Sequence, residues 1–240
     1  MKHLVYCIFS HSNFDFQALP AGIDGQPVSI LSTIDLDLAY SIINELNTES
    51  SIAHLLIYHQ VIESFNRHLT VIPMRYPTIF ANKSKTVKHL TEWKDQYLKM
   101  LEELDGCVEM GIRILNNEHA RHILQVKAED IHPVTQMLQS DKPGTTFLKS
   151  RKEYYKKKAN PHFIDNNTKI NNVFKGLFVD FKEEDIQKND IMSSLYYLVP
   201  RENIKRFKKM FHRISSNESP KLLLSGPWPP YNFVQSELNQ

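Results

Sequence analysis

The chain has 240 residues, a length that suffices for one large domain or two small ones. Of these residues 41% are hydrophobic and 23% charged, a composition typical of a globular protein. Its 29 Lys and Arg residues against 27 Asp and Glu residues leave a net charge of +2. That charge favours neither a nucleic acid nor an acidic partner. The chain lacks a run of about 18 apolar residues, so we expect no membrane-spanning helix. Residues 9–15 turn polar before a signal peptide could form, which favours a reduced cytoplasmic protein.

The first elements predicted are strands. Residues 4–9 form a continuous apolar run rich in β-formers, which predicts a central strand. After a polar loop with proline and glycine turn signals, residues 28–31 and 34–40 predict two short strands of a hairpin or a sheet edge. The Asp-Leu-Asp-Leu alternation at residues 35–38 favours a strand with one solvent-facing side.

Two helices and a further strand are predicted next. Apolar residues at helical spacing over residues 52–65 predict an amphipathic helix. Residues 69–80 predict a strand that leads into a loop restricted by two prolines. The clearest helix follows, with Ser84 as its N-cap and Gly106 just beyond its C-terminus.

Residues 107–115 alternate between apolar and other side chains. Glu109, Gly111 and Arg113 share one face, which predicts a half-exposed strand. Cys7 and Cys107 both lie in apolar runs and are expected to be small buried hydrophobic residues rather than a disulfide or a redox motif.

The second half of the chain predicts the order strand, helix, strand, strand, helix, strand. Residues 118–139 are polar and give no clear signal. The elements after residue 115 are a basic helix over 145–159, strands over 174–181 and 191–199, an amphipathic helix over 204–214 and a buried strand over 222–224. This order is that of a ferredoxin-like split βαβ unit. We therefore predict an α+β fold with a mixed-sheet domain over residues 1–105 and a ferredoxin-like domain over residues 106–240.

The segment at residues 226–233 combines prolines and aromatic residues. Gly226 and Pro227 are expected to end the preceding strand, and the prolines restrict φ around the aromatic side chains. A rigid aromatic segment near a C-terminus predicts docking, either on the chain's own domains as a strut or on a partner. The side chains concerned are Trp228, Pro229, Pro230, Tyr231 and Phe233.

Signals for catalysis are scarce. GxGxxG, P-loop, GxSxG and HExxH motifs are absent, and we expect no cofactor. His119 and His122 lie three apart but lack a third ligand at a fixed offset, so a metal site is not favoured. Arg75, Glu109 and Arg113 are open to two interpretations, an enzyme site in a pocket or an interdomain ion-pair network, and we favour the network.

The strongest basic run covers residues 149–158, where tyrosines interrupt lysines and arginines. This composition is compatible with binding RNA or a phosphate backbone. A solvated helix face with packed tyrosines is the simpler interpretation, because nearby acidic residues cancel the overall charge.

Taken together, the segments resemble the gas-vesicle accessory proteins of the GvpL/GvpF type. Residues 4–8 match a first strand, and residues 71–80 (VIPMRYPTIF) are similar to the "lPlRFGTvf" segment of that family. Residues 104–113 and 143–151 resemble its "l.G..E..v.v" strand and "pG.aYL..r" helix start. Residues 225–233 (SGPWPPYNF) resemble its terminal "GPWPPYsF".

The chain departs from the family pattern in two places. Tyr76-Pro77 stands where the family has Phe-Gly, and Thr146-Phe147 replaces Ala-Tyr. The proline replaces a residue that could adopt positive φ, so we expect a stiffer loop at residue 77. Any contact that the family makes through that glycine's backbone is not carried over.

The resemblance implies two α+β domains and a non-enzymatic accessory role in forming gas vesicles, the gas-filled protein shells that give cells buoyancy. It implies binding to the small hydrophobic shell protein and to other accessory proteins during nucleation, in the cytoplasm and then at the vesicle. A rigid aromatic surface could cover the apolar face of such a shell protein. The residues expected to contact a partner or to join the domains are Arg75, Glu109, Arg113, Trp228, Pro229, Pro230, Tyr231 and Phe233. An RNA- or phosphate-binding module is the alternative.

Overall fold

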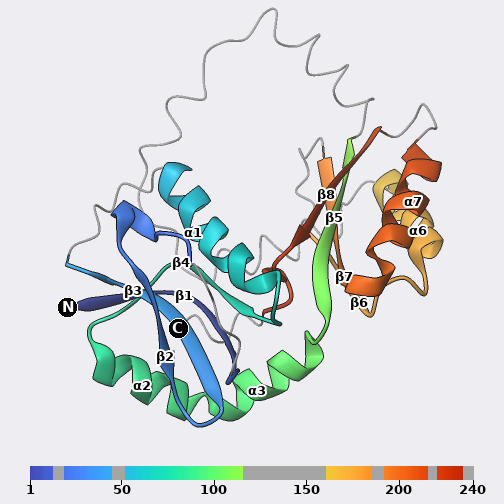
Figure 1. Cartoon of the computed structure of the whole chain (residues 1–240). Coiled ribbons are helices and arrows are strands. Elements are labelled where there is room, and N and C mark those ends of the chain that lie inside the picture. The colour runs from blue at the N-terminus through green and yellow to red at the C-terminus, as the bar shows by residue number, and fades with distance from the viewer. Residues whose placement is uncertain (13–18, 45–51, 116–160, 185–191, 216–220, 235–240) are drawn as a thin grey trace, which may run out of the picture. The chain divides into compact units, whose positions relative to one another are not determined.

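The computed structural model describes residues 1–12, 19–44, 52–115, 161–184, 192–215 and 221–234 (Figure 1). It has the mixed α+β architecture predicted from the sequence. The chain forms two compact units that interleave along the sequence. Unit 1 comprises Met1–Glu109, Leu198–Arg201 and Gly226–Gln240, and unit 2 comprises Met110–Tyr197 and Glu202–Ser225. The domain boundary between residues 105 and 106 stays a prediction.

Unit 1 contains an antiparallel sheet with the strand order β2-β3-β1-β4. Its strands are β1 (Lys2–Ser10), β2 (Val28–Ser32), β3 (Leu36–Ile43) and β4 (Ile72–Phe80). Figure 1 shows α1 (Ile52–Asn66) on one side of this sheet, with α2 (Lys83–Glu92) and α3 (Lys94–Glu103) on the other. Residues 3–9 of β1 are buried because helices cover both faces, as expected for the predicted central strand.

The predicted solvent-facing side of the second hairpin strand is wrong. In β3, Asp37 is only 3% exposed. Its carboxylate makes a 3.0 Å hydrogen bond with His11 Nδ1 and accepts another from the Ser12 backbone N–H at 3.3 Å. These partners explain how a carboxylate fits in a buried strand, because hydrogen bonds offset the cost of removing it from water.

Strand β4 continues through both of its prolines, where a strand followed by a loop was predicted. Val5 of β1 pairs with Thr78, but Cys7 pairs with Pro73, so residues 74–77 stand opposite a single residue of β1. This irregularity is a large bulge, and proline is tolerated because β4 is an edge strand that need not donate every ladder hydrogen bond. The bulge contains Arg75, whose side chain is exposed.

The predicted long helix before Gly106 consists of α2 and α3, with Trp93 at the junction. Asn82, not Ser84, is the N-cap, because its side-chain oxygen accepts a 3.0 Å hydrogen bond from the Lys85 backbone N–H. Gly106 follows α3 with φ = 62°, the left-handed conformation that the predicted stop requires.

The second sheet has the strand order β6-β7-β5-β8. Its strands are β5 (Cys107–Leu115), β6 (Asp180–Glu183), β7 (Met192–Pro200) and β8 (Lys221–Trp228). Helix α6 (Pro161–Phe174) lies between β5 and β6 in the sequence, and α7 (Ile204–Ser215) lies between β7 and β8. Figure 1 shows both helices on the same side of these strands. The order of elements agrees with a split βαβ unit, and the ferredoxin-like assignment stays a prediction.

The core of unit 2 is aromatic. Phe174 stacks on Phe207 with ring centroids 4.3 Å apart, and Tyr197 packs against both rings. The strand predicted over residues 174–181 is wrong at its start, because Phe174 ends helix α6 and the strand begins at Asp180. The predicted basic helix at 145–159 and residues 118–139 lie outside the described residues.

The last strand also differs from its prediction. β8 extends to Trp228 instead of stopping before Gly226, and it is an edge strand rather than a buried one. Leu223 is 44% exposed. An edge position allows Pro227 to lie within the strand because no neighbour requires its missing N–H. None of the described helices combines the length and apolar character needed to span a membrane.

Candidate functional site

Glu109 holds the C-terminal segment from strand β5. Its side chain was predicted on a solvent-facing side, but the residue is 4% exposed, and only Arg113 of the predicted polar face is exposed. The Glu109 carboxylate accepts hydrogen bonds from the Asn232 backbone N–H at 2.8 Å and from Asn232 Nδ2 at 2.7 Å. Such short bonds to a carboxylate are stronger than bonds between neutral groups. The predicted half-exposed strand therefore has a buried carboxylate that binds the terminal motif.

A tight turn places the residues on either side of Tyr231. The Tyr231 backbone N–H donates to the Pro229 carbonyl at 2.8 Å, and the Phe233 N–H donates to the Pro230 carbonyl at 3.1 Å. Pro229 and Pro230 are buried, and Phe233 is 7% exposed. The prolines thus serve as packed anchors, and the turn directs the aromatic side chains to the body of unit 1.

Tyr231 packs on the hydrophobic core of unit 1 and reaches helix α1. Its hydroxyl forms a 3.2 Å hydrogen bond with His59 Nδ1. Burial raises the pKa of Tyr231 and lowers the pKa of His59, and Glu63, 4.0 Å from His59 Nε2, partly opposes the second effect. Both side chains are therefore held in their neutral forms at pH 7.

Trp228 is the aromatic residue of the segment that keeps much of its surface in solvent, with 38% exposed. Its ring meets the His59 ring edge-on, with centroids 5.3 Å apart. Along α1 from His59, Ile52, Leu55 and Leu56 are 76%, 44% and 56% exposed. Their spacing of three or four residues places them on the same helix face as His59. We call Ile52, Leu55, Leu56 and Trp228 the α1–Trp228 face.

Arg201 makes a second set of contacts, at the end of α1, that was not predicted from the sequence. The Arg201 guanidinium donates to the Asn66 backbone carbonyl and, at 3.2 Å, to Asn66 Oδ1. The Arg201 backbone N–H donates to the Gly106 carbonyl at 2.9 Å. These bonds join three parts of unit 1 that are distant in sequence. No local pattern marks Arg201, whereas Asn232 could have been found because it lies inside the terminal motif.

The other predicted site residues lie in different surroundings. Arg75 is exposed in the β4 bulge and Arg113 is exposed on β5, whereas Glu109 is buried. Whether these residues and the terminal segment contact a partner or join the domains stays a prediction.

The described residues include no group of three or more His, Cys, Asp or Glu side chains arranged to hold a metal ion. His119 and His122, the pair considered in the sequence, lie outside those residues, as does the basic run at 149–158. Cys7 and Cys107 are free and buried, as predicted, and burial raises the pKa of both thiols.

Comparison with known families gives one decisive match. The profile described as "Gas vesicle synthesis protein GvpL/GvpF" matches residues 2–235. The chain belongs to this family. The match spans both units and confirms the resemblance seen in the four sequence motifs, including the terminal segment that Glu109 binds. Membership of this family supports an accessory role in gas vesicle formation.

Solved structures show the same fold. The crystal structure of the gas vesicle protein GvpF from Anabaena sp. PCC7120 has a TM-score of 0.72 at 20% identity, covering 98% of this chain and 96% of that one. GvpF from Microcystis aeruginosa has a TM-score of 0.69 at 19% identity, covering 98% and 99% of the two chains. A search of curated proteins gives no match. Members of the family thus share this architecture at low sequence identity.

Proposed function

We propose that the chain is a non-enzymatic assembly factor that binds the hydrophobic gas vesicle shell protein, together with other accessory proteins, during nucleation. Family membership supports the gas vesicle role. The observation that supports binding of the shell protein is the α1–Trp228 face, whose four large apolar side chains are between 38% and 76% exposed. Apolar side chains grouped on a surface mark sites of interaction with another apolar surface.

The contacts beneath this face make it suited to binding. Asn232 is hydrogen-bonded to Glu109 and Tyr231 to His59, so the turn that directly follows Trp228 is held at two adjacent residues. A surface that is ordered before binding loses less conformational entropy when a partner arrives. Tryptophan contributes a large apolar area to such contacts.

A hydrophobic shell subunit needs a binding partner before it joins the vesicle. A small shell subunit with an apolar face would associate non-specifically in water, because removing apolar surface from water is favourable at about 25 cal/mol per Å². A partner with an exposed apolar face can cover that surface until the subunit joins the shell. We propose that the chain acts in the cytoplasm before assembly and at the vesicle during it.

A co-purification experiment tests this function. The tagged full chain is co-expressed with the gas vesicle shell protein of the same organism, and the shell protein recovered with it is measured. We expect recovery with the wild-type chain and at least about a tenfold loss with the Leu55→Ser, Leu56→Ser double variant, since each buried leucine contributes about 1.5–3 kcal/mol.

The matched control replaces an apolar residue of unit 2. Val179 is 61% exposed, so Val179→Ser removes apolar surface outside the α1–Trp228 face and should leave recovery unchanged. Equal recovery with wild type and the double variant would contradict the assignment of this face. No recovery with the wild-type chain would contradict shell-protein binding itself.

A further inference from the structure

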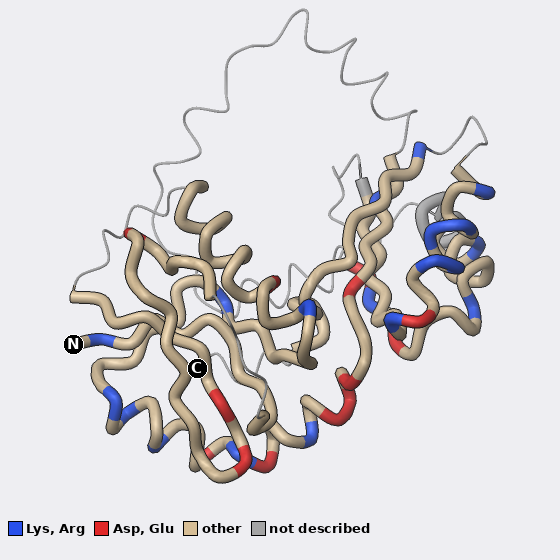
Figure 2. The backbone as a smooth tube through the Cα atoms, viewed as in Figure 1, with Lys and Arg blue, Asp and Glu red and all other residues tan. Residues whose placement is uncertain are grey.

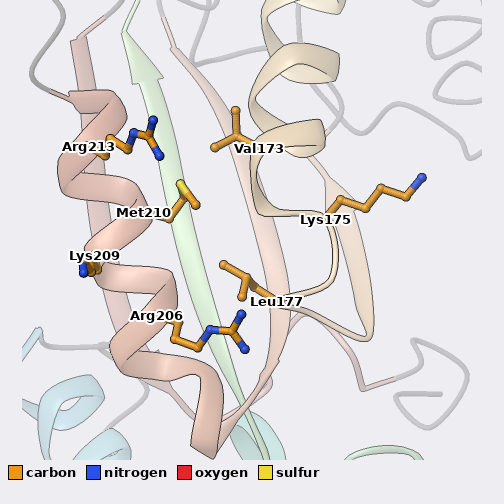
Figure 3. Close-up of a pocket in the computed structure, with 7 residues that line it drawn as sticks. All are labelled: Val173, Lys175, Leu177, Arg206, Lys209, Met210 and Arg213. Carbon is orange, nitrogen blue, oxygen red and sulfur yellow. The ribbon is translucent and has the colours of Figure 1, made fainter.

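Unit 2 contains a pocket with an apolar centre and basic walls. It lies between α7 and the end of α6 and has a volume of about 630 Å³ (Figure 3). In Figure 3, Arg206, Met210 and Arg213 extend from α7 towards the opposite wall, where Val173 and Leu177 face them. The complete lining is Val173, Lys175, Leu177, Arg206, Lys209, Met210 and Arg213. Four of its seven residues are cationic and none is acidic.

Within the described residues, no acidic side chain pairs with the cations that line this pocket. Between Ile204 and Ser215, α7 contains Lys205, Arg206, Lys208, Lys209 and Arg213 but no Asp or Glu. Figure 2 shows the concentration of Lys and Arg along this helix. Because the whole chain has a net charge of only +2, this charge is a local feature.

The cations follow a helical spacing. Arg206, Lys209, Met210 and Arg213 stand at positions i, i+3, i+4 and i+7 of α7 and so share one face. At a rise of 1.5 Å per residue, Arg206 and Arg213 are about 10 Å apart along the helix axis. A partner helix with carboxylates at the same spacing could pair with both ends of this face while an apolar side chain contacts Met210.

We propose that this pocket binds an acidic amphipathic helix of a protein partner. The apolar centre, formed by Val173, Leu177 and Met210, takes leucine-like side chains, and Arg206 and Arg213, which extend towards the opposite wall in Figure 3, bind glutamates or aspartates. Arginine suits this role because its planar guanidinium can bind a carboxylate through two hydrogen bonds. The combination of an apolar groove and a basic rim is complementary to an acidic amphipathic helix in both polarity and charge.

The lining favours a protein over a nucleic acid. Proteins that bind single-stranded nucleic acid pair cations with aromatic rings on which bases stack. The pocket has no aromatic residue among its lining side chains, and its centre is aliphatic. A phosphate backbone placed over Val173 and Met210 would lose hydration without gaining hydrogen bonds there.

This inference does not rest on the proposed shell-protein contact, because the pocket lies in unit 2 and the α1–Trp228 face includes only residues of unit 1. Its test uses a designed ligand rather than a gas vesicle protein. Failure of either proposal therefore leaves the other in place.

The experiment measures fluorescence anisotropy of a labelled synthetic peptide of about 15 residues, designed as a helix with glutamates on either side of a leucine stripe. The full-length chain is the receptor. We expect saturable binding that weakens as salt is added, because the ion pairs are exposed to solvent. Two further peptides separate the contributions: one replaces the glutamates by glutamine, and the other replaces the leucines by serine. Both should bind at least about tenfold more weakly.

Variants of α7 locate the site. The Arg206→Glu, Arg213→Glu double variant should lower the affinity at least about tenfold. The Lys205→Glu, Lys208→Glu variant makes the same change of net charge on the same helix outside the pocket lining, and it should retain most of the binding. Circular dichroism confirms that both variants are folded.

Three results would overturn the proposal. One is equal loss of peptide binding in both double variants, which would indicate a non-specific charge effect. Another is undiminished binding of the serine-substituted peptide, which would exclude the apolar centre. The third is tighter binding of a single-stranded RNA oligonucleotide or of phosphatidylglycerol vesicles, if the Arg206→Glu, Arg213→Glu variant abolishes it. That outcome would assign the pocket to nucleic acid or to lipid.

Discussion

The contact between Glu109 and Asn232 offers the sharpest test of how the C-terminal segment is held. Glu109→Gln preserves the size of the side chain but removes its charge and replaces one acceptor oxygen by a donor. The two bonds affected measure 2.8 and 2.7 Å, and Glu109 is 4% exposed. Loss of one bond to a charged group costs about 1.5–3 kcal/mol. In a chain of this size, where 1 kcal/mol shifts Tm by about 2–4 °C, that loss corresponds to a fall in Tm of about 3–12 °C.

The assay uses the tryptophan of the segment as its reporter. The chain has two tryptophans, Trp93 and Trp228, so a Trp93→Phe background leaves Trp228 as the single emitter. Urea unfolding is followed by Trp228 emission and, in parallel, by circular dichroism. Each probe gives a urea midpoint, one for the exposure of Trp228 and one for the loss of helix. We expect Glu109→Gln to lower the Trp228 midpoint more than the helix midpoint, because the contact is local.

A control variant addresses the general effect of removing a carboxylate. Glu103 pairs with Lys99 at 3.8 Å on the surface of α3, where both side chains are at least half exposed. Glu103→Gln should change stability by about 0.5 kcal/mol or less. If Glu109→Gln were as mild as this control by both probes, the reasoning that the buried carboxylate fastens the terminal segment would be refuted.

Three further predictions concern the same unit. Trp228→Ala should lower the free energy of unfolding by about 2 kcal/mol, less than for a fully buried tryptophan, because 38% of the side chain is exposed; thermal unfolding measures this. Burial lowers the pKa of His59 below 6.5, so the unfolded chain takes up the proton first and stability should fall as the pH drops through about 6.5. His59→Gln should reduce the fall in Tm over this pH range. If the Tm of the variant fell as much as that of the wild-type chain, His59 would not be the group responsible. Gly22→Ala places a methyl group 2.3 Å from the Tyr6 hydroxyl, and a loss of about 2–3 kcal/mol is expected in urea unfolding; an unchanged midpoint would show that the turn yields.

Much of the fold follows from local patterns in the sequence. The apolar run at residues 4–9 correctly indicated the central strand β1, and Gly106 correctly marked a helix end. The periodicity of residues 204–214 indicated α7, whose Phe207 and Phe211 are buried. In each case one local signal, either apolar spacing or a glycine conformation, determines the structure.

The errors arise where tertiary contacts override the local pattern. Asp37 and Glu109 read as solvent-facing because alternation records polarity, but each is buried by partners that lie far away in the sequence. Pro73 and Pro227 read as ends of strands, yet both lie in edge strands, where a missing donor is tolerated. Strand order is a property of the whole chain, so no local signal could have supplied it.

The candidate site was predictable in part. The terminal motif directed attention to Trp228 and Tyr231, but nothing local connects them with His59, which lies 172 residues before Tyr231. The apolar residues at the start of α1 were counted as part of the apolar face of a predicted amphipathic helix. In the structure, the buried apolar residues of α1 lie in its second half, at Tyr58, Val61, Ile62 and Phe65. The apolar residues of the first half are therefore left exposed.

Vesicle formation in a deletion strain tests whether this chain is needed to assemble gas vesicles. The gene for this chain is deleted in its own organism, and gas vesicles are counted by electron microscopy with and without a plasmid that supplies the wild-type chain. We expect vesicles to be absent after deletion and to return with the wild-type chain. A normal number of vesicles in a deletion strain that has no related chain would contradict a role in assembly.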